Sequence, residues 1–131
     1  MIIVIDSNEY IDCINKKTDI TEILSNKGLI ICVHNIIIKE VLDNLIESAK
    51  KEFYKLLFNN NIFVNDGILP LYLFEKYKKL GLKKGDIIIA AFCEYVEADY
   101  LITENRHFLK IKNFDRFNIL NIKDFLTKIK E

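Results

Sequence analysis

The chain has 131 residues, half of them hydrophobic, which is enough for one domain with a substantial core. Its 19 basic residues balance 19 acidic ones, so no overall basic field indicates a nucleic-acid partner, and any such binding must rest on local patches. Three scattered cysteines without a C-x-x-C pair argue against structural zinc and favour a reducing compartment. We find no apolar stretch near the about 18 residues of a membrane span and no signal-peptide pattern, so we expect a cytoplasmic protein.

The first half of the chain alternates apolar runs with helical patterns. Residues 2–5 are all β-branched, which predicts a strand buried on both faces. A second apolar run at 29–33 follows Gly28, a residue suited to end a helix. The helical patterns of this half cover residues 8–15, 19–26 and 35 to about 60, the last with a break near Ser48.

The second half repeats this alternation with shorter strands. Pro70 opens a helical pattern that runs to residue 80, where Gly81 ends it. Further strands are predicted at residues 62–64, 100–102 and 117–120. Further helices are predicted at residues 86–97, over a short stretch from 105, and at 122–130.

Strands that alternate with helices predict an α/β fold. Apolar runs without polar alternation favour a parallel sheet with helices on both faces, that is, a three-layer α/β/α domain. Right-handed crossovers from a central first strand favour the strand order 3-2-1-4-5. With no linker or internal repeat, residues 1–131 form one domain in this interpretation. In such sheets, side chains just past the carboxyl ends of the strands line the ligand crevice.

Asp6 stands directly after the first predicted strand. This position places its carboxylate at the crevice, whereas a simpler role is to cap the helix that follows, together with Ser7 and Asn8. Asp86 offers a second carboxylate, at the start of a helix that is apolar over most of its circumference. Because burying an unpartnered carboxylate costs several kcal/mol, Asp86 must cap its helix, meet a cation, or both.

Glu40 is a third acidic candidate, one turn into the helix after the second strand. It shares a polar face with Lys39, Asp43 and Glu47, which is also the pattern of an ordinary solvated face. Its place near the carboxyl edge of the strand beside the first one favours Glu40, and Asp43 is the alternative one turn further on.

The fourth strand ends in polar residues at the same expected edge. Thr103, Glu104 and Asn105 together supply a hydroxyl, a carboxylate and an amide that can hold a hard cation directly or through water. Asn105 can alternatively cap the short helix after it. His34 and His107 are isolated from each other in the pattern, so we expect neither to be a metal ligand.

These stretches resemble the PIN domain, the nuclease fold of VapC-type toxins and of many RNA-processing proteins. The order and spacing match over nearly the whole chain, and the four motifs are Val-Ile-Asp6-Ser-Asn8, Ile-Lys-Glu40-Val-Leu, Gly-Asp86-Ile-Ile-Ile-Ala-Ala and Ala98-Asp-Tyr-Leu-Ile-Thr-Glu-Asn105-Arg-His-Phe108. By this resemblance Asp6, Glu40 and Asp86 occupy the three acidic positions of the family, and Asn8 and Thr103 its polar supporting positions. The departure is Asn105, where many members have a fourth aspartate; Glu104 next to it is the candidate to substitute for that carboxylate.

Three convergent carboxylates repel one another unless protons or cations compensate them, and an oxygen-only site suits Mg²⁺ or Mn²⁺. We therefore expect metal-dependent hydrolysis of phosphodiester bonds, with RNA as the substrate because the resemblance implies it. The expected metal ligands are Asp6, Glu40 and Asp86, and Asn105 and Asn8 would orient water or a ligand.

Cations for the RNA backbone are expected from Lys83, Lys84 and Arg106, which lie beside Asp86 and Asn105 in the sequence. The resemblance further implies an endoribonuclease toxin with an antitoxin-like protein inhibitor, and a homodimer. The alternative from another functional class is a non-catalytic PIN-like module that binds RNA or a protein. A receiver domain and a haloacid-dehalogenase-type phosphatase are disfavoured, because an acidic pair or Asp-x-Asp after the first strand is absent.

Overall fold

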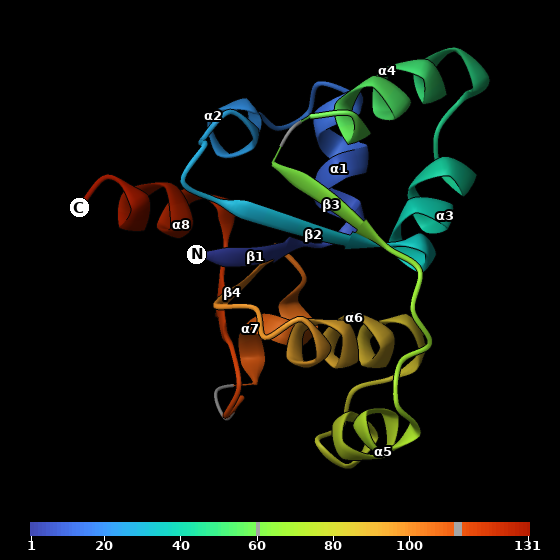
Figure 1. Cartoon of the computed structure of the whole chain (residues 1–131), viewed down its shortest axis with the longest axis vertical. Coiled ribbons are helices and arrows are strands. Elements are labelled where there is room, and N and C mark those ends of the chain that lie inside the picture. Colours follow the sequence, from blue (N-terminus) through green and yellow to red (C-terminus); the bar gives the residue numbers. More distant parts are fainter. Residues whose placement is uncertain (60, 112–113) are drawn as a thin grey trace.

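The computed structural model describes residues 1–59, 61–111 and 114–131. In these ranges five parallel strands form one sheet in the order β3-β2-β1-β4-β5, which confirms the predicted order (Figure 1). The strands are β1 (Ile2–Ile5), β2 (Ile30–His34), β3 (Ile62–Asn65), β4 (Tyr100–Ile102) and β5 (Asn118–Leu120).

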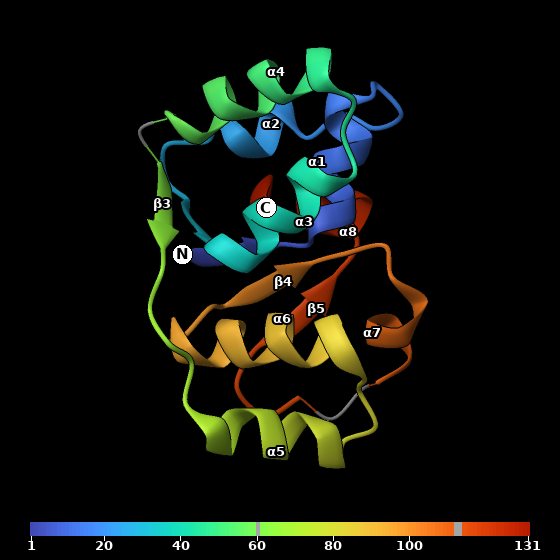
Figure 2. The ribbon, with the colours of Figure 1, turned by 90° about the vertical axis from the view of Figure 1, so that its right-hand side faces the viewer.

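Helices cover both faces of this sheet. They are α1 (Ser7–Ile14), α2 (Thr21–Leu24), α3 (Asn35–Asp43), α4 (Glu47–Leu57), α5 (Leu71–Lys79), α6 (Lys84–Tyr95), α7 (Arg106–Lys110) and α8 (Ile122–Ile129). Figure 2 shows α1, α3 and α4 on one side of the sheet and α5 and α6 on the other. In the described ranges, every helix is too short or too polar to cross a membrane.

Strand β1 lies at the centre of the sheet, as its composition predicts. Ile3 pairs with Ile31 of β2 on one side and with Tyr100 of β4 on the other. Ile3, Val4 and Ile5 are fully buried, because helices pack on both faces of the strand. The carboxyl end of β1 therefore opens between the ends of two neighbouring strands.

The long helical region after β2 is broken between α3 and α4, close to the predicted break. The side-chain amide of Asn44 donates to the backbone oxygen of Glu40 over 2.8 Å, which competes with continuation of the helix. The chain re-enters a helix at Glu47, and α4 ends at Leu57. The expected end near residue 60 lies outside the described residues. The break turns α4 away while α3 keeps Glu40 near the sheet edge.

The second helix is shorter than its pattern predicted. Asp19 accepts hydrogen bonds from the backbone N–H and the hydroxyl of Thr21, so the helix begins at Thr21 rather than at residue 19. His34 ends β2 and caps α3: its Nδ1 accepts from the N–H of Ile36, and its Nε2 lies 2.8 Å from the backbone oxygen of Gly67. His34 thus links the start of α3 to the segment that contains Gly67.

Candidate active site

Asp6 follows β1 and is 2% exposed, with its N–H donating to the backbone oxygen of Ile102 over 3.0 Å. It is the N-cap residue of α1, yet within the described chain its side chain makes no capping hydrogen bond. Instead its Oδ2 accepts from the hydroxyl of Thr103 over 2.8 Å. Of the two roles that the sequence allowed, the structure favours the crevice over the cap.

Glu40 is brought to Asp6 by Ser7. The Ser7 hydroxyl lies 2.8 Å from Glu40 Oε1 and 3.3 Å from Asp6 Oδ1, so it joins the two carboxylates. A Cβ atom on Gly85 would lie 3.9 Å from Glu40 Oε2, which places Glu40 over the start of α6. The alternative candidate, Asp43, is exposed and pairs with Lys39 at 2.7 Å. Glu40 is therefore the acidic residue that α3 contributes.

Asp86 lies in the first turn of α6, where the positive end of the helix dipole favours a carboxylate. Asn105 Nδ2 donates to Asp86 Oδ1 over 3.3 Å, and His107 Nδ1 lies 3.6 Å from Asp86 Oδ2. Asn105 also caps α7, because its Oδ1 accepts from the N–H of His107. An aspartate at this position could cap α7 but, when ionised, could not donate to Asp86. The Asn105 side chain thus both caps α7 and contacts Asp86.

We call Asp6, Glu40 and Asp86 the acidic cluster. Burial raises the pKa of Asp6, the hydrogen bonds from Thr103 and from the Ser7 backbone counteract this, and the charges of Asp86 and Glu40 raise the pKa further. Both charges act on Asp6, so the three carboxylates share one electrostatic environment. Such a group carries excess negative charge that a proton or a cation can compensate.

Thr103 is the residue that fixes Asp6. It is fully buried, its N–H donates to the backbone oxygen of Leu120, and its hydroxyl accepts from the N–H of Asn105 while donating to Asp6. The polar end of β4 is therefore attached on one side to β5 and on the other to the acidic cluster.

Glu104 turns away from the acidic cluster. Its Oε1 accepts from the N–H of Ile122 over 3.0 Å and anchors the start of α8. Its own N–H donates to Oε2 of Glu9 over 3.3 Å. Glu9 is a site residue that the sequence analysis missed. The signal that could have found it is its place three residues after Asp6, in the first turn of α1.

Glu9 is 1% exposed, which is unusual for a glutamate that pairs with no lysine, arginine or histidine of the described residues. Burial, followed by the charge of Asp6, raises the pKa of Glu9 to about 7. A fourth carboxyl group thus lies beside the acidic cluster, close enough to Asp6 for the charge of Asp6 to raise its pKa.

The remaining predicted residues lie on the surface around this site. Asn8 is exposed on α1, and it is Ser7 that contacts the carboxylates. Lys83, Lys84 and Arg106 are exposed at the starts of α6 and α7, next to Asp86 and Asn105 along the chain. Lys84 has a φ of 45°, in the left-handed region.

The oxygen donors of the acidic cluster suit a hard divalent cation, but the spacing of its carboxylates suits such an ion less well. Its donors are carboxylate oxygens, with the amide oxygen and nitrogen of Asn105 already in use on α7 and Asp86. Among residues 1–59, 61–111 and 114–131, no group of three or more Asp, Glu, His or Cys side chains is arranged to hold a metal ion. A cation at the cluster would therefore have to draw these carboxylates together.

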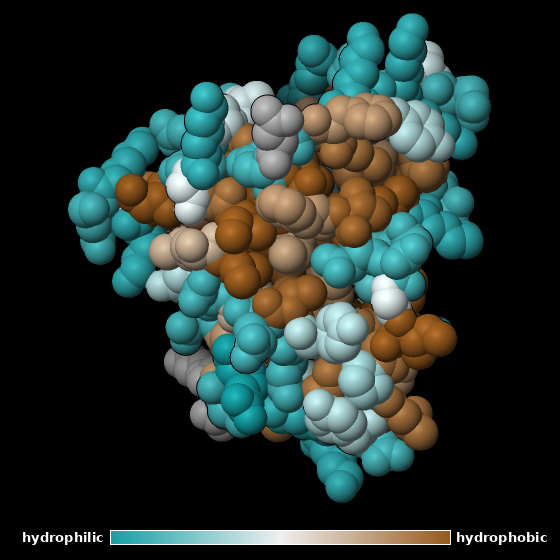
Figure 3. All heavy atoms as spheres, viewed as in Figure 1, coloured by the Kyte–Doolittle hydropathy of each residue, from teal (hydrophilic) through white to brown (hydrophobic). Residues whose placement is uncertain are grey.

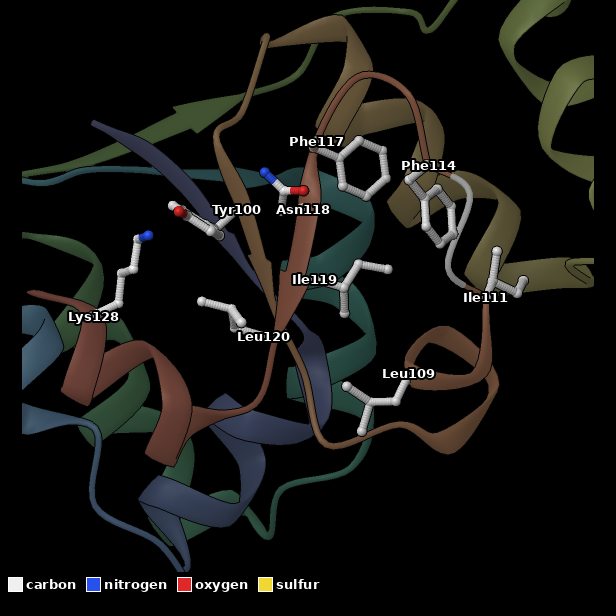
Figure 4. Close-up of a pocket in the computed structure, with 9 residues that line it drawn as sticks. All are labelled: Tyr100, Leu109, Ile111, Phe114, Phe117, Asn118, Ile119, Leu120 and Lys128. Atoms are coloured by element: carbon white, nitrogen blue, oxygen red, sulfur yellow. The ribbon is translucent and has the colours of Figure 1, made fainter.

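A groove of about 520 Å³ lies away from the acidic cluster, along β5 (Figure 4). In Figure 4, Phe117 and Ile119 point to one side of β5, toward Phe114, and Leu120 and Lys128 lie on its other side, as expected for alternating side chains on a strand. The described lining residues include no carboxylate. The groove is therefore separate from the candidate active site.

Comparison with solved structures supports this architecture. A chain in the crystal structure of VapBC2 from Rickettsia felis, bound to a DNA fragment from their promoter, matches with a TM-score of 0.62 and 21% identity. The match covers 92% of this chain and 98% of that chain. No protein-family model and no curated protein matches the sequence. The structural likeness confirms the PIN-like fold that the sequence resemblance implied.

Proposed function

We propose that this chain is an endoribonuclease that uses Mg²⁺ or Mn²⁺ to hydrolyse RNA phosphodiester bonds. The observation that carries the proposal is the acidic cluster: a buried Asp6 whose pKa is raised by burial and by the charges of Asp86 and Glu40. The PIN-like fold and the resemblance to VapC-type toxins favour a nuclease with RNA as substrate over other metal-dependent hydrolases.

In this proposal Asp6, Glu40 and Asp86 hold the cation. The bound cation would polarise the phosphate and lower the pKa of an attacking water. Ser7 and Thr103 keep the Glu40 and Asp6 carboxylates in place through their hydroxyl groups. Binding of the cation would also relieve the repulsion that the cluster now carries.

Backbone phosphates of the RNA would be bound by Lys83, Lys84 and Arg106. All three are exposed and belong to the helix starts that carry Asp86 and follow Asn105. Their contribution would be electrostatic and independent of sequence, because lysine and arginine contact phosphates rather than base edges in this role.

Cleavage assays on structured and unstructured RNA test the proposal. We expect wild type to cut with Mn²⁺ and to stop in chelator, and Asp86→Asn to lose about 100-fold or more in rate, because it removes charge from the metal site. Glu94→Gln is the matched control, since it makes the same acid-to-amide change at the other end of α6. Equal Mn²⁺-dependent rates in wild type and Asp86→Asn would contradict the proposal.

A non-catalytic module that binds RNA or a protein is the second candidate. It is favoured by Asn105, which uses its amide on Asp86, and by the absence of a ready-made metal site among the described residues. In that case RNA binds with chelator and with Mn²⁺ alike, and no cleavage appears in either.

We further propose a cytoplasmic toxin with an antitoxin-like protein inhibitor. The support is the match to a chain of the VapBC2 complex. A small DNA-binding protein in the neighbouring reading frame is the expected inhibitor. Co-expression should yield a complex that elutes together and no longer cleaves RNA, and separate elution with unchanged cleavage would contradict this.

We also propose that the chain forms a homodimer. The face shown in Figure 3 carries apolar atoms over β2 and β3, and Phe63 and Val64 of the edge strand β3 are each 51% exposed. Sedimentation should give twice the mass of one chain. Phe63→Glu should shift it toward the monomer if β3 belongs to the interface, whereas a monomeric wild type would contradict the proposal.

A further inference from the structure

The buried carboxyl group of Glu9 has a free-energy cost that packing does not explain. Its Oε2 accepts the N–H of Glu104, whereas its Oε1 is buried and, within the described residues, has no hydrogen-bond partner. A buried polar atom without a partner destabilises the folded state, because it loses its hydrogen bonds to water. An apolar side chain would fill the same place in α1 without that cost, so the carboxyl group calls for a role other than packing.

The bond from Glu104 to Glu9 is one of the attachments of a short polar segment, residues 103–105. Its first residue, Thr103, donates to Asp6, and its last residue, Asn105, donates to Asp86. The residue between them, Glu104, contacts neither and is held instead by Glu9 through its backbone and by the start of α8 through its side chain. The segment thus connects two carboxylates of the acidic cluster, and Glu9 holds its middle.

The surroundings of Glu9 do not compensate its charge. Besides burial, the charges of Asp6, Glu104 and Asp12 raise its pKa, and the hydrogen bond from the Glu104 backbone lowers it. This environment is unfavourable for a carboxylate whose only task is to stabilise the fold, and it lies against the active-site wall.

We propose that Glu9 is a positioning residue of the active site: by accepting the N–H of Glu104, it fixes residues 103–105 so that Thr103 and Asn105 hold Asp6 and Asp86 in their working geometry. This role rests on the proposed nuclease function. Glu9 itself takes no part in the chemistry and touches no substrate.

Two substitutions separate positioning from packing. Glu9→Leu removes both oxygens and fills the volume, so the melting temperature should stay at or above that of wild type, while kcat falls about 10- to 100-fold with KM within about twofold. Glu9→Gln retains an acceptor oxygen for Glu104 and should restore kcat to within about threefold of wild type. Glu52→Leu, on the exposed face of α4, controls for the loss of a glutamate elsewhere. A folded Glu9→Leu protein with wild-type kcat overturns the proposal, as does a Glu9→Gln protein as impaired as Glu9→Leu.

Hydrogen exchange of the Glu104 amide gives a readout that needs no activity. In wild type and Glu9→Gln this amide should be protected, and in Glu9→Leu it should exchange at least tenfold faster, while the amides of β1 are unchanged. An unprotected Glu104 amide in wild type overturns the proposal without any variant. If protection follows this pattern but no protein cleaves RNA, the attachment by Glu9 stands and the nuclease function fails.

Discussion

Helix α6 carries carboxylates at both ends, in opposite environments. Glu94, in its last turn, lies 2.6 Å from the ammonium group of Lys76 and accepts from the hydroxyl of Tyr77 over 2.7 Å, and Lys76 also contacts Asp115 at 3.0 Å. Asp86, in its first turn, is hydrogen-bonded only by a neutral amide among the described side chains and has an exposed histidine 3.6 Å away. The last turn of α6 is therefore ion-paired with α5, whereas the negative charge of Asp86 in the first turn is uncompensated.

The carboxyl groups that neighbour these two ends of α6 differ in the direction of their pKa shifts. The hydrogen bond from Lys76 lowers the pKa of Asp115, whereas burial and neighbouring carboxylates raise the pKa of Asp6 and of Glu9. A lysine held beside a carboxylate stabilises the charged form of that carboxylate. A group of buried carboxylates without such a lysine is stabilised in the charged form only when a cation binds. Charge compensation, rather than residue type, therefore separates the ion-paired acids near the end of α6 from the carboxyl groups in and beside the candidate active site.

The largest effect that we expect is stabilisation by Mn²⁺ at the acidic cluster. At about 100 times its dissociation constant, a bound ion adds about 2.7 kcal/mol to the free energy of unfolding. Asp6→Asn should gain little from Mn²⁺ and should melt at or above wild type in chelator, because it removes both a ligand and a repelling charge. Thermal melts of both proteins with and without Mn²⁺ measure this.

If Asp6 served only as a helix cap, Asn would replace it with little change in stability. Wild type would then show no specific Mn²⁺ response, and the distinction between the two ends of α6 would fail.

The ion-paired end of α6 should respond to substitution by losing stability. Glu94→Gln leaves Lys76 with Asp115 alone and weakens the acceptor for Tyr77, so the free energy of unfolding should fall by about 1–2 kcal/mol, reduced by the partial exposure of Lys76. RNA cleavage should stay within about threefold of wild type. Urea denaturation and the cleavage assay measure the two effects, and a loss of cleavage without a loss of stability would reverse the assignment.

The contribution of the uncompensated carboxyl groups to stability should fall as the pH rises. Because the pKa of Glu9 is raised to about 7 in the folded protein, the folded state binds more protons than the unfolded state between about pH 4.5 and 7. Its contribution is therefore full below pH 4.5 and is lost as the pH rises to 7. Asp6, Asp12 and Glu104 face Glu9 and strengthen this trend.

Urea denaturation from pH 4.5 to 7 measures this slope. Glu9→Gln, which does not titrate, should flatten it, whereas Asp115→Asn should not, because the lowered pKa of Asp115 acts below this window. Parallel slopes for wild type and Glu9→Gln would exclude Glu9 as their source.

The smallest effect concerns the lysines before Asp86. Lys83→Ala together with Lys84→Ala should weaken RNA binding and reduce the salt dependence of log K by about 0.7 for each phosphate that the variant no longer neutralises. Stability should hardly change, since both side chains are exposed and alanine adopts the φ of 45° at position 84 no more easily than lysine. The matched control is Lys27→Ala with Lys51→Ala, also exposed. An unchanged salt slope would show that the two lysines do not bind RNA phosphates.

The arrangement of the strands could be predicted from the amino-acid sequence. Runs such as residues 2–5 show burial on both faces through composition alone, and right-handed crossovers then leave few strand orders, of which 3-2-1-4-5 is confirmed. The placement of Asp6 and Thr103 at one sheet edge follows from the same rule, because parallel strands end together.

The choice of which polar groups meet at that edge depends on the packing of separate elements. Thr103 and Asp6 are 97 positions apart, and Glu9 and Glu104 are 95 apart, so no local periodicity relates them. Helical periodicity indicates which face of α1 carries Glu9, but the burial of Glu9 depends on the segment that packs over α1. The choice between Ser7 and Asn8, and the turning of Glu104 toward α8, likewise depend on distances of about 3 Å between separate elements, within which a hydrogen bond either forms or does not.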